Sequence, residues 1–188
     1  MWSKGKTVSL IVAGLLIGCK AMPIYVSPQA SEIERRPVNT SVPHVPATVT
    51  AAASSNVTLS TTEQNAILKE IESWMGTPYA FGKIEKGKGV DCSGFVVSVF
   101  KQALSMDLPR QTSELYSTGV QVQKSELKFG DLVFLEGTYK GSKGASHVGI
   151  FVGNDQMAHA STTAGVTISK LSEEYYVKHH LGCRRIIK

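Results

Sequence analysis

The chain changes character near residue 61, and this change limits how much of it can fold. The segment before this point holds five of the seven prolines, and no Asp, Glu, Lys or Arg lies between Val38 and Thr62. Serine, threonine, alanine and valine dominate there without a sustained period, which is typical of flexible linkers. We therefore predict a disordered tether over residues 19–61. Residues 62–188 are predicted to form a single compact domain, long enough for its own hydrophobic core.

The first 18 residues have the pattern of an export signal. Lys4 and Lys6 supply positive charge, and residues 8–17 form an apolar run that is too short to span a bilayer. The run ends in Leu-Ile-Gly-Cys at Cys19, which resembles the lipobox of bacterial lipoproteins. We predict a lipoprotein signal peptide over residues 1–18 and a lipid anchor, with palmitate among its acyl chains, on Cys19. An ordinary secretory signal with a chance cysteine is the alternative.

The residue after the lipobox cysteine bears on where such a protein is sorted. Lys20 stands where an aspartate would favour retention in the inner membrane. For a bacterium with two membranes, the resemblance to lipoproteins therefore implies a place in the cell envelope at the outer membrane, facing the periplasm. No other segment of the sequence is long and apolar enough to cross a bilayer.

The remaining sequence has helical patterns first and strand-like patterns later. Ser60-Thr61-Thr62-Glu63 is a capping box, and Ile67, Ile71 and Trp74 recur behind it at helical spacing until Gly76-Thr77-Pro78 ends the helix. Helices followed by strands indicate an α+β fold, with helices packed on an antiparallel sheet. The other expected elements are a helix from Cys92 to about residue 106, a short helix within 110–119, strands over 131–135, 147–152, 156–160, 166–169 and 182–187, and an amphipathic segment over 172–178.

A lone cysteine, Cys92, stands at the expected start of the second helix, after Asp91, which can cap that helix. Backbone N–H groups and the helix dipole favour the thiolate at such a position, and the thiolate is the nucleophilic form. A cysteine on an apolar helix is more often a small buried residue. The position at the helix start, the small Ser93-Gly94 neighbourhood and two histidines further along favour a catalytic role for Cys92.

The two histidines lie in consecutive strand-like runs joined by Gly153-Asn154-Asp155, which is a hairpin signal. With these three residues as the loop, Val152 would oppose Gln156, and His147 and His159 would share one face of the sheet. A two-residue loop would place the histidines on opposite faces. The catalytic interpretation therefore predicts the three-residue loop.

Together these residues predict the chemistry of a thiol hydrolase. Cys92 would attack a carbonyl, His147 would take and return the proton, and His159 would orient the base. The backbone N–H of Cys92 and the hydroxyl of Tyr79 are candidate oxyanion donors, although Tyr79 is equally explained as a core aromatic. This chemistry needs no metal or cofactor, and we expect none.

Several short motifs also occur along the chain in a fixed order: Thr77-Pro78-Tyr79, Asp91-Cys92-Ser93-Gly94-Phe95, Leu108-Pro109-Arg110, Gly130-Asp131-Leu132-Val133-Phe134, His147-Val148-Gly149-Ile150 and His159-Ala160-Ser161. In this order they resemble the NlpC family of papain-like cysteine peptidases of bacterial cell walls, over roughly residues 67–185. The combination of lipobox, tether and one domain resembles the small outer-membrane lipoproteins of that family.

This resemblance implies a minimal papain-like fold and hydrolysis of peptidoglycan stem peptides or their cross-links. The bond cut would be a γ-D-glutamyl–diamino-acid or a D-alanyl–diamino-acid bond. The site residues that the resemblance implies are Cys92 as the nucleophile, His147 as the base, His159 as the third polar residue, Tyr79 as the oxyanion partner, and Asp91 and Ser93 near the substrate pocket.

Two positions depart from that family's pattern. Lys83 stands where many relatives have a second glycine, which leaves the geometry of the substrate loop open. Cys183 is a further thiol, which we expect to be buried and inert rather than paired with Cys92. Asp91 is explained at least as well by helix capping as by contact with substrate.

Three other functions remain compatible with the sequence. A zinc hydrolase could use Cys92, His147 and His159 as ligands, but no short-spaced pair of ligands supports it. A catalytically silent wall-binding scaffold would have no need of the cysteine and both histidines, and an acyl transferase could use the same thiol. The net charge of +5 is mild and no nucleic-acid motif is present. We therefore expect peptidoglycan peptides and a membrane as partners, no nucleic acid, and a monomer.

Overall fold

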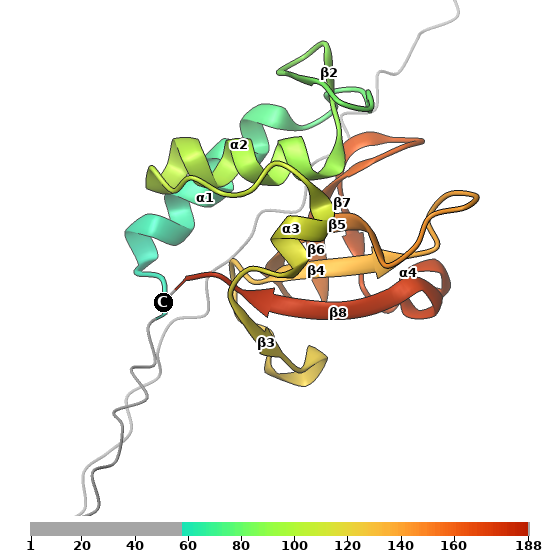
Figure 1. The fold of residues 1–188 in the computed structure, drawn as a ribbon. Helices are drawn as coiled ribbons and strands as arrows, with labels where there is room; N and C mark the ends of the chain where they lie inside the picture. The colour runs from blue at the N-terminus through green and yellow to red at the C-terminus, as the bar shows by residue number, and fades with distance from the viewer. Residues whose placement is uncertain (1–57, 188) are drawn as a thin grey trace, which may run out of the picture. The chain divides into compact units, whose positions relative to one another are not determined.

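The computed structural model describes residues 58–187, so the predicted signal peptide, Cys19 and nearly all of the predicted tether lie outside the described residues. Within residues 58–187, no helix is long and apolar enough to cross a membrane. The helices are α1 (Thr61–Trp74), α2 (Cys92–Leu104), α3 (Thr112–Tyr116), α4 (Glu174–His179) and a 3₁₀ turn, η1 (Lys124–Glu126), as Figure 1 shows for the α-helices.

A six-stranded antiparallel sheet, in the order β3-β8-β4-β5-β6-β7, forms the second half of the domain. Helices α1 and α2 lie together beside this sheet (Figure 1). This arrangement confirms the predicted α+β fold; β1, β2 and β3 were not expected from the sequence. The strands are β1 (Ile84–Glu85), β2 (Gly89–Val90), β3 (Val120–Val122), β4 (Leu132–Glu136), β5 (Ala145–Gly153), β6 (Gln156–Ser161), β7 (Gly165–Lys170) and β8 (His180–Arg185).

The start of α1 confirms the predicted capping box. The Ser60 hydroxyl accepts from the Glu63 N–H, and the Glu63 carboxylate accepts from the Ser60 N–H at 2.8 Å. Ile67, Ile71 and Trp74 form the buried face of the helix. Leu59, just before the cap, is also buried in the core, so the folded domain includes the last residues that the sequence assigned to the tether.

Strand β4 separates two apolar clusters because successive side chains of a strand point to opposite faces. Leu132 and Phe134 pack into the main core with α1 and α2, whereas Val133 and Leu135 pack into a second cluster on the other face. Both faces of the central strand are therefore buried, which explains its continuous apolar sequence. The nucleophile candidate, Cys92, lies in the first of these clusters.

The hairpin between β5 and β6 differs from the prediction in its loop. Gly153 pairs with Gln156, so the turn is the two-residue Asn154-Asp155, both with positive φ (50° and 59°) as a type I′ turn requires. The predicted pairing of Val152 with Gln156 is therefore wrong.

A register shift between Phe151 and Gly153 leaves Val152 as an extra residue, a β-bulge, and it changes which face the earlier residues occupy. Beyond the bulge Ile150 pairs with Ala158, so Gly149 lies opposite His159. The bulge therefore keeps both histidines on one face despite the short turn.

Candidate active site

The first turn of α2 positions the thiol, as the sequence predicted. Asp91 is the N-cap in an extended conformation, and its carboxylate accepts from the Gly94 N–H at 2.7 Å. Cys92 is the first helical residue and is buried. Glycine is favoured at position 94 because a Cβ there would lie 2.8 Å from the Ile84 side chain and 3.1 Å from the Lys83 carbonyl oxygen.

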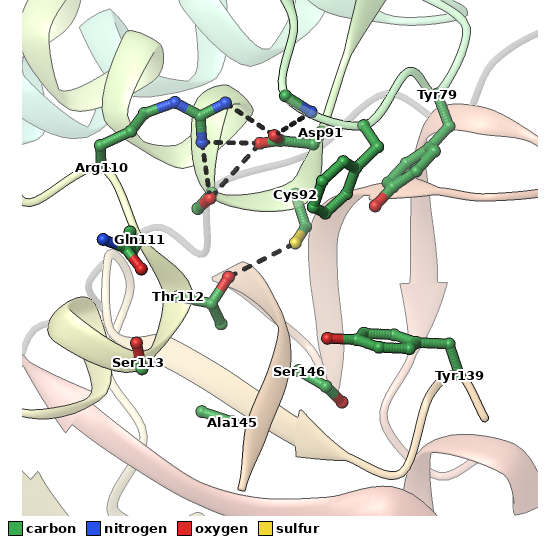
Figure 2. Close-up of a pocket in the computed structure, with 13 residues that line it drawn as sticks. Tyr79, Asp91, Cys92, Arg110, Gln111, Thr112, Ser113, Tyr139, Ala145 and Ser146 are labelled. Carbon is green, nitrogen blue, oxygen red and sulfur yellow. Dashed lines mark hydrogen bonds and ion pairs between the residues drawn. The ribbon is translucent and has the colours of Figure 1, made fainter. Parts of the chain in front are cut away.

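Arg110 is an ion-pair partner for Asp91 that the sequence analysis did not assign. Its guanidinium donates to both carboxylate oxygens of Asp91, at 2.9 and 2.6 Å, and also to the Ser93 hydroxyl at 2.8 Å. The Gly82 N–H donates to the same carboxylate at 2.8 Å. Burial by itself raises the pKa of Asp91, but the hydrogen bonds from Arg110 and Gly94 outweigh it and hold the pKa below its usual value. Asp91, which contacts Arg110 in Figure 2, and Ser93 thus fix the helix start and the loop before it.

The surroundings of the thiol differ from those that the sequence suggested. Burial raises the pKa of Cys92, against the lowering expected at a helix start, although contacts with Thr112 and the backbone of Val148 oppose the rise. The Thr112 hydroxyl lies 3.7 Å from Cys92 Sγ (Figure 2). Dehydration of the thiol outweighs the helix dipole, so Cys92 rests as a neutral thiol and needs a base.

The two histidines form a direct pair on the neighbouring strands β5 and β6. His147 Nε2 lies 2.9 Å from His159 Nδ1, and both rings are buried. Burial, and to a lesser extent the charge of His159, lowers the pKa of His147 to about 3. Burial likewise lowers the pKa of His159 to about 4, although Glu173 opposes it. Both imidazoles are therefore neutral near pH 7. The backbone of Val148, the residue that follows His147 in β5, contacts Cys92.

Two further side chains contact His159, and neither was singled out from the sequence. Ser169 Oγ on β7 and the Tyr176 hydroxyl on α4 lie 3.1 and 3.2 Å from His159 Nε2. The Tyr176 hydroxyl also donates to Ser169 Oγ at 3.0 Å. These residues are 10 and 17 positions from His159 in the chain, so only the folded topology brings them together.

Two cavities adjoin the thiol and the imidazoles. One, of about 440 Å³, is lined by Cys92, Asp91 and Arg110 among others, and the other, of about 360 Å³, by His147 and His159. Tyr79, Tyr139 and Ser146 line both cavities. The cavities therefore form two halves of one cleft, with the thiol in the wall of one half and the imidazoles in the wall of the other.

Tyr79 lies where the two halves meet, in agreement with its predicted place near the thiol. A bridge between Tyr79 and Val90 places it beside the start of α2, and its ring lies near Cys92 in Figure 2. Burial, followed by the nearby Cys92 and Asp91, raises the pKa of Tyr79 to about 12. The phenol therefore keeps its proton and can donate a hydrogen bond near the thiol.

The structure shows the surroundings of Lys83 and Cys183, the two positions that depart from the family pattern. Gly82 has a positive φ of 74°, whereas Lys83 does not, so the loop places no glycine requirement on Lys83. Cys183 is free and buried in the second apolar cluster, across the sheet from Cys92, and it lies 3.4 Å from His180 Nε2. Burial raises the pKa of Cys183 to about 11, which is consistent with the expected inert thiol.

Known proteins resemble this chain in both sequence and fold. A sequence model described as the NlpC/P60 family matches residues 76–185. The "Probable endopeptidase NlpC homolog" of Haemophilus influenzae is 41% identical over 122 residues, which cover 65% of this chain and 62% of that protein. The "Murein DD-endopeptidase MepS/Murein LD-carboxypeptidase" of Escherichia coli K12 is 41% identical over 124 residues, covering 66% of this chain and 63% of the relative. The chain thus spans less than two thirds of the length of these relatives.

Solved structures give the same assignment. A protein of the NLP/P60 family from Staphylococcus aureus, described as "similar to lipoprotein", superposes with a TM-score of 0.65 at 29% identity, over 72% of this chain and 45% of that one. The peptidoglycan hydrolase RipB of Mycobacterium tuberculosis superposes with a TM-score of 0.55 at 28% identity, over 67% and 65% of the two chains. The matched region extends over more than half of the sequence and includes the thiol, both histidines and the sheet that carries them. This chain belongs to the NlpC/P60 family.

Proposed function

We propose that this chain is a cysteine endopeptidase that hydrolyses peptidoglycan stem peptides or their cross-links. The observation that carries the proposal is the two-part cleft. Cys92, the first residue of α2, lines one half of it, and a neutral, hydrogen-bonded pair of imidazoles lines the other half. Relatives named as murein endopeptidases and a structural neighbour named as a peptidoglycan hydrolase support this substrate class.

In the proposed reaction the neutral thiol must be activated as it attacks. His147 Nδ1 takes the proton from Cys92 Sγ while the sulfur forms a bond to the carbonyl carbon of the peptide. The resulting imidazolium then protonates the leaving nitrogen, and the C–N bond breaks to leave a thioester. A water molecule, deprotonated by His147, attacks the thioester and releases the acid and the free thiol. His159 holds the ring of His147 in place through the 2.9 Å bond to Nε2.

The developing oxyanion needs donors that are in position before the reaction starts. The backbone N–H of Cys92 is one, because the first N–H groups of a helix have no partner within it. The Tyr79 hydroxyl is the second, since its raised pKa keeps the phenol protonated. Asp91 and Ser93 act indirectly in this scheme, by holding the helix start together with Arg110.

Incubation of purified peptidoglycan fragments with the protein, followed by mass spectrometry, tests this function. We expect new fragments whose masses identify the bond that is cut. Cys92→Ala should produce none, whereas Cys183→Ala, which removes the other free thiol of the described region, should cut as the wild type does. If wild type and Cys92→Ala give the same fragments, hydrolysis by this thiol is refuted. If the wild type joins peptides instead of cutting them, the thiol serves acyl transfer.

We further propose that Cys19 carries a lipid anchor and that the protein works at the outer membrane, facing the periplasm. The lipobox-like Leu-Ile-Gly-Cys and Lys20 support this proposal. Labelling of growing cells with radioactive palmitate should mark the wild type but not Cys19→Ser, and membrane fractionation should place the label at the outer membrane. Label that persists in Cys19→Ser would contradict the anchor.

A further inference from the structure

A short chain of hydrogen bonds starts at His147 and continues along the imidazole half of the cleft, whose wall includes His159 and Tyr176. It runs from His147 Nε2 to His159 Nδ1, and from His159 Nε2 to the hydroxyls of Ser169 and Tyr176. Ser169 comes from β7 and Tyr176 from α4, so three separate elements meet at one imidazole edge. The ring of Tyr176 also packs edge-on against His159, with centroids 5.5 Å apart.

While the rings of His147 and His159 are both neutral, the protons along this series of hydrogen bonds can be arranged in only two ways. In the first, His147 carries its proton on Nε2 and donates to His159 Nδ1, so His159 must carry its own proton on Nε2. In the second, His159 donates from Nδ1 to His147 Nε2, and the proton of His147 then lies on Nδ1. Only the first arrangement leaves His147 Nδ1 with a lone pair that can take a proton from Cys92.

The contacts around His159 Nε2 favour the first arrangement. An N–H at this atom needs an acceptor, and two hydroxyl oxygens lie within 3.2 Å of it. The proton of Tyr176 is directed to Ser169 Oγ, which leaves lone pairs on the Tyr176 oxygen to face His159. Ser169 Oγ can accept from both neighbours, because a hydroxyl oxygen has two lone pairs.

We propose that Ser169 and Tyr176 are positioning residues that hold His159 in its Nε2–H tautomer and thereby keep His147 Nδ1 free to act as the base. This inference rests on the proposed function, in which His147 activates Cys92. Neither hydroxyl touches the reacting atoms. Their effect is on the fraction of molecules whose base is correctly protonated, and it should therefore lower kcat and leave KM unchanged.

The kinetic test uses the variants Ser169→Ala, Tyr176→Phe and the double variant. We expect the double variant to lose about 10- to 100-fold in kcat, the range found when partners that orient other functional histidines are removed, with KM unchanged. Ser169→Thr keeps the hydroxyl, so it should retain most of the activity that Ser169→Ala loses. Ser172→Ala and Tyr116→Phe are matched controls, because Ser172 is exposed and Tyr116 packs against Phe134, away from His159. An unchanged kcat in the folded double variant would overturn the proposal.

Nitrogen-15 NMR of the imidazole rings provides a readout that does not depend on activity. In the wild type we expect protonated Nε2 on both His147 and His159, and in the double variant a mixture of tautomers for His159. A wild-type His159 protonated on Nδ1 would overturn the proposal. NMR reads the tautomers directly, so it tests the role of Ser169 and Tyr176 even if the protein cuts no peptidoglycan. Absence of cleavage would refute the proposed function but would leave the proposed role of these two residues to be decided by the NMR result.

Discussion

The two halves of the cleft are held together by different forces. On the thiol side, Asp91 and Arg110 form a two-point ion pair that also fixes Ser93 and the Gly82 amide. On the imidazole side, His147 and His159 are held by hydrogen bonds among groups that are all uncharged near neutral pH. The thiol side therefore depends on keeping its charges, and the imidazole side depends on having none.

This difference predicts that acid damages the imidazole side first and has the largest effect. An unfolded histidine has a pKa near 6.5, whereas His147 and His159 in the fold have values of about 3 and 4. Between these limits the unfolded chain binds more protons than the folded chain does. The contribution of the two histidines to the free energy of unfolding is therefore fully present above pH 6.5 and is lost as the pH is lowered. At pH 5 we expect a loss of about 2 kcal/mol for each histidine, measured by urea denaturation at pH 7.5 and 5.0.

The thiol side supplies the internal control for this measurement. The pKa of Asp91 is lowered by its partners, so its contribution is present above the unfolded value near 3.9 and is lost only as the pH falls below it. Between pH 6.5 and 4 the ion pair is therefore intact. His180, whose pKa burial also lowers, adds to the slope, and His180→Gln measures its share. A free energy of unfolding that does not change from pH 7.5 to 5.0 would show that the imidazoles are not buried as described.

The next largest effect is expected at the junction of the two halves. Tyr79→Phe removes only the hydroxyl of a residue that lines both halves of the cleft, and we expect kcat to fall about 100-fold, as for the loss of one oxyanion donor. KM and thermal stability should change little, because the ring remains. Tyr116→Phe is the matched control. Equal values of kcat for Tyr79→Phe and the wild type would assign Tyr79 to packing alone.

Removing one charge should test the thiol side itself. Arg110→Met leaves the Asp91 carboxylate, which is 8% exposed, without its partner. Breaking a buried pair costs about 3–5 kcal/mol, but the Arg110 side chain is 38% exposed, so solvent screening reduces our expectation to about 2 kcal/mol in urea denaturation. Lys101→Met breaks an exposed pair with Asp107 and should cost less than about 0.5 kcal/mol. Similar losses for both variants would mean that the Arg110 pair contributes no more than a surface contact.

The smallest effect is expected from crowding the imidazole side. A Cβ at Gly149 would lie 3.1 Å from His159 Cβ and 3.0 Å from the Ala158 carbonyl oxygen. Gly149→Ala should therefore cost about 1 kcal/mol in stability and displace His159 enough to lower kcat, because tight packing leaves little room for another methyl group. A variant with unchanged melting temperature and kcat would show that the strand moves aside without affecting the pair.

The sequence was sufficient for features that depend on local patterns. The capping box of α1, the Asp91 cap and the α+β order all follow from residues close together in the chain. The shared face of His147 and His159 was predicted from a three-residue loop, but in the structure it depends on the bulge at Val152, which the sequence did not reveal. The contacts that complete the site come from further away. Arg110 lies 19 positions from Asp91, and Tyr176 lies 17 from His159, so no period or spacing reveals them.

The pKa of Cys92 illustrates a different limit. The helix start was visible in the sequence, but the burial that raises the pKa of the thiol depends on the packing of α2 against the sheet. A short-range electrostatic argument therefore gave the wrong direction. The correct direction required knowing how much water the fold removes from the sulfur.

The bulge at Val152 has a consequence for how this hairpin tolerates changes in length. Side chains alternate between faces, so an odd change in the number of paired residues moves every earlier side chain to the other face. In this hairpin the surplus residue is stored in the bulge, directly before the Gly153–Gln156 pair that closes the turn and outside the stretch between His147 and Ile150. Deleting Val152 would remove the irregularity and leave the pairing of Ile150 with Ala158 intact, whereas deleting a residue between His147 and Ile150 would turn His147 away from His159. Natural insertions and deletions in this strand should therefore concentrate at the bulge.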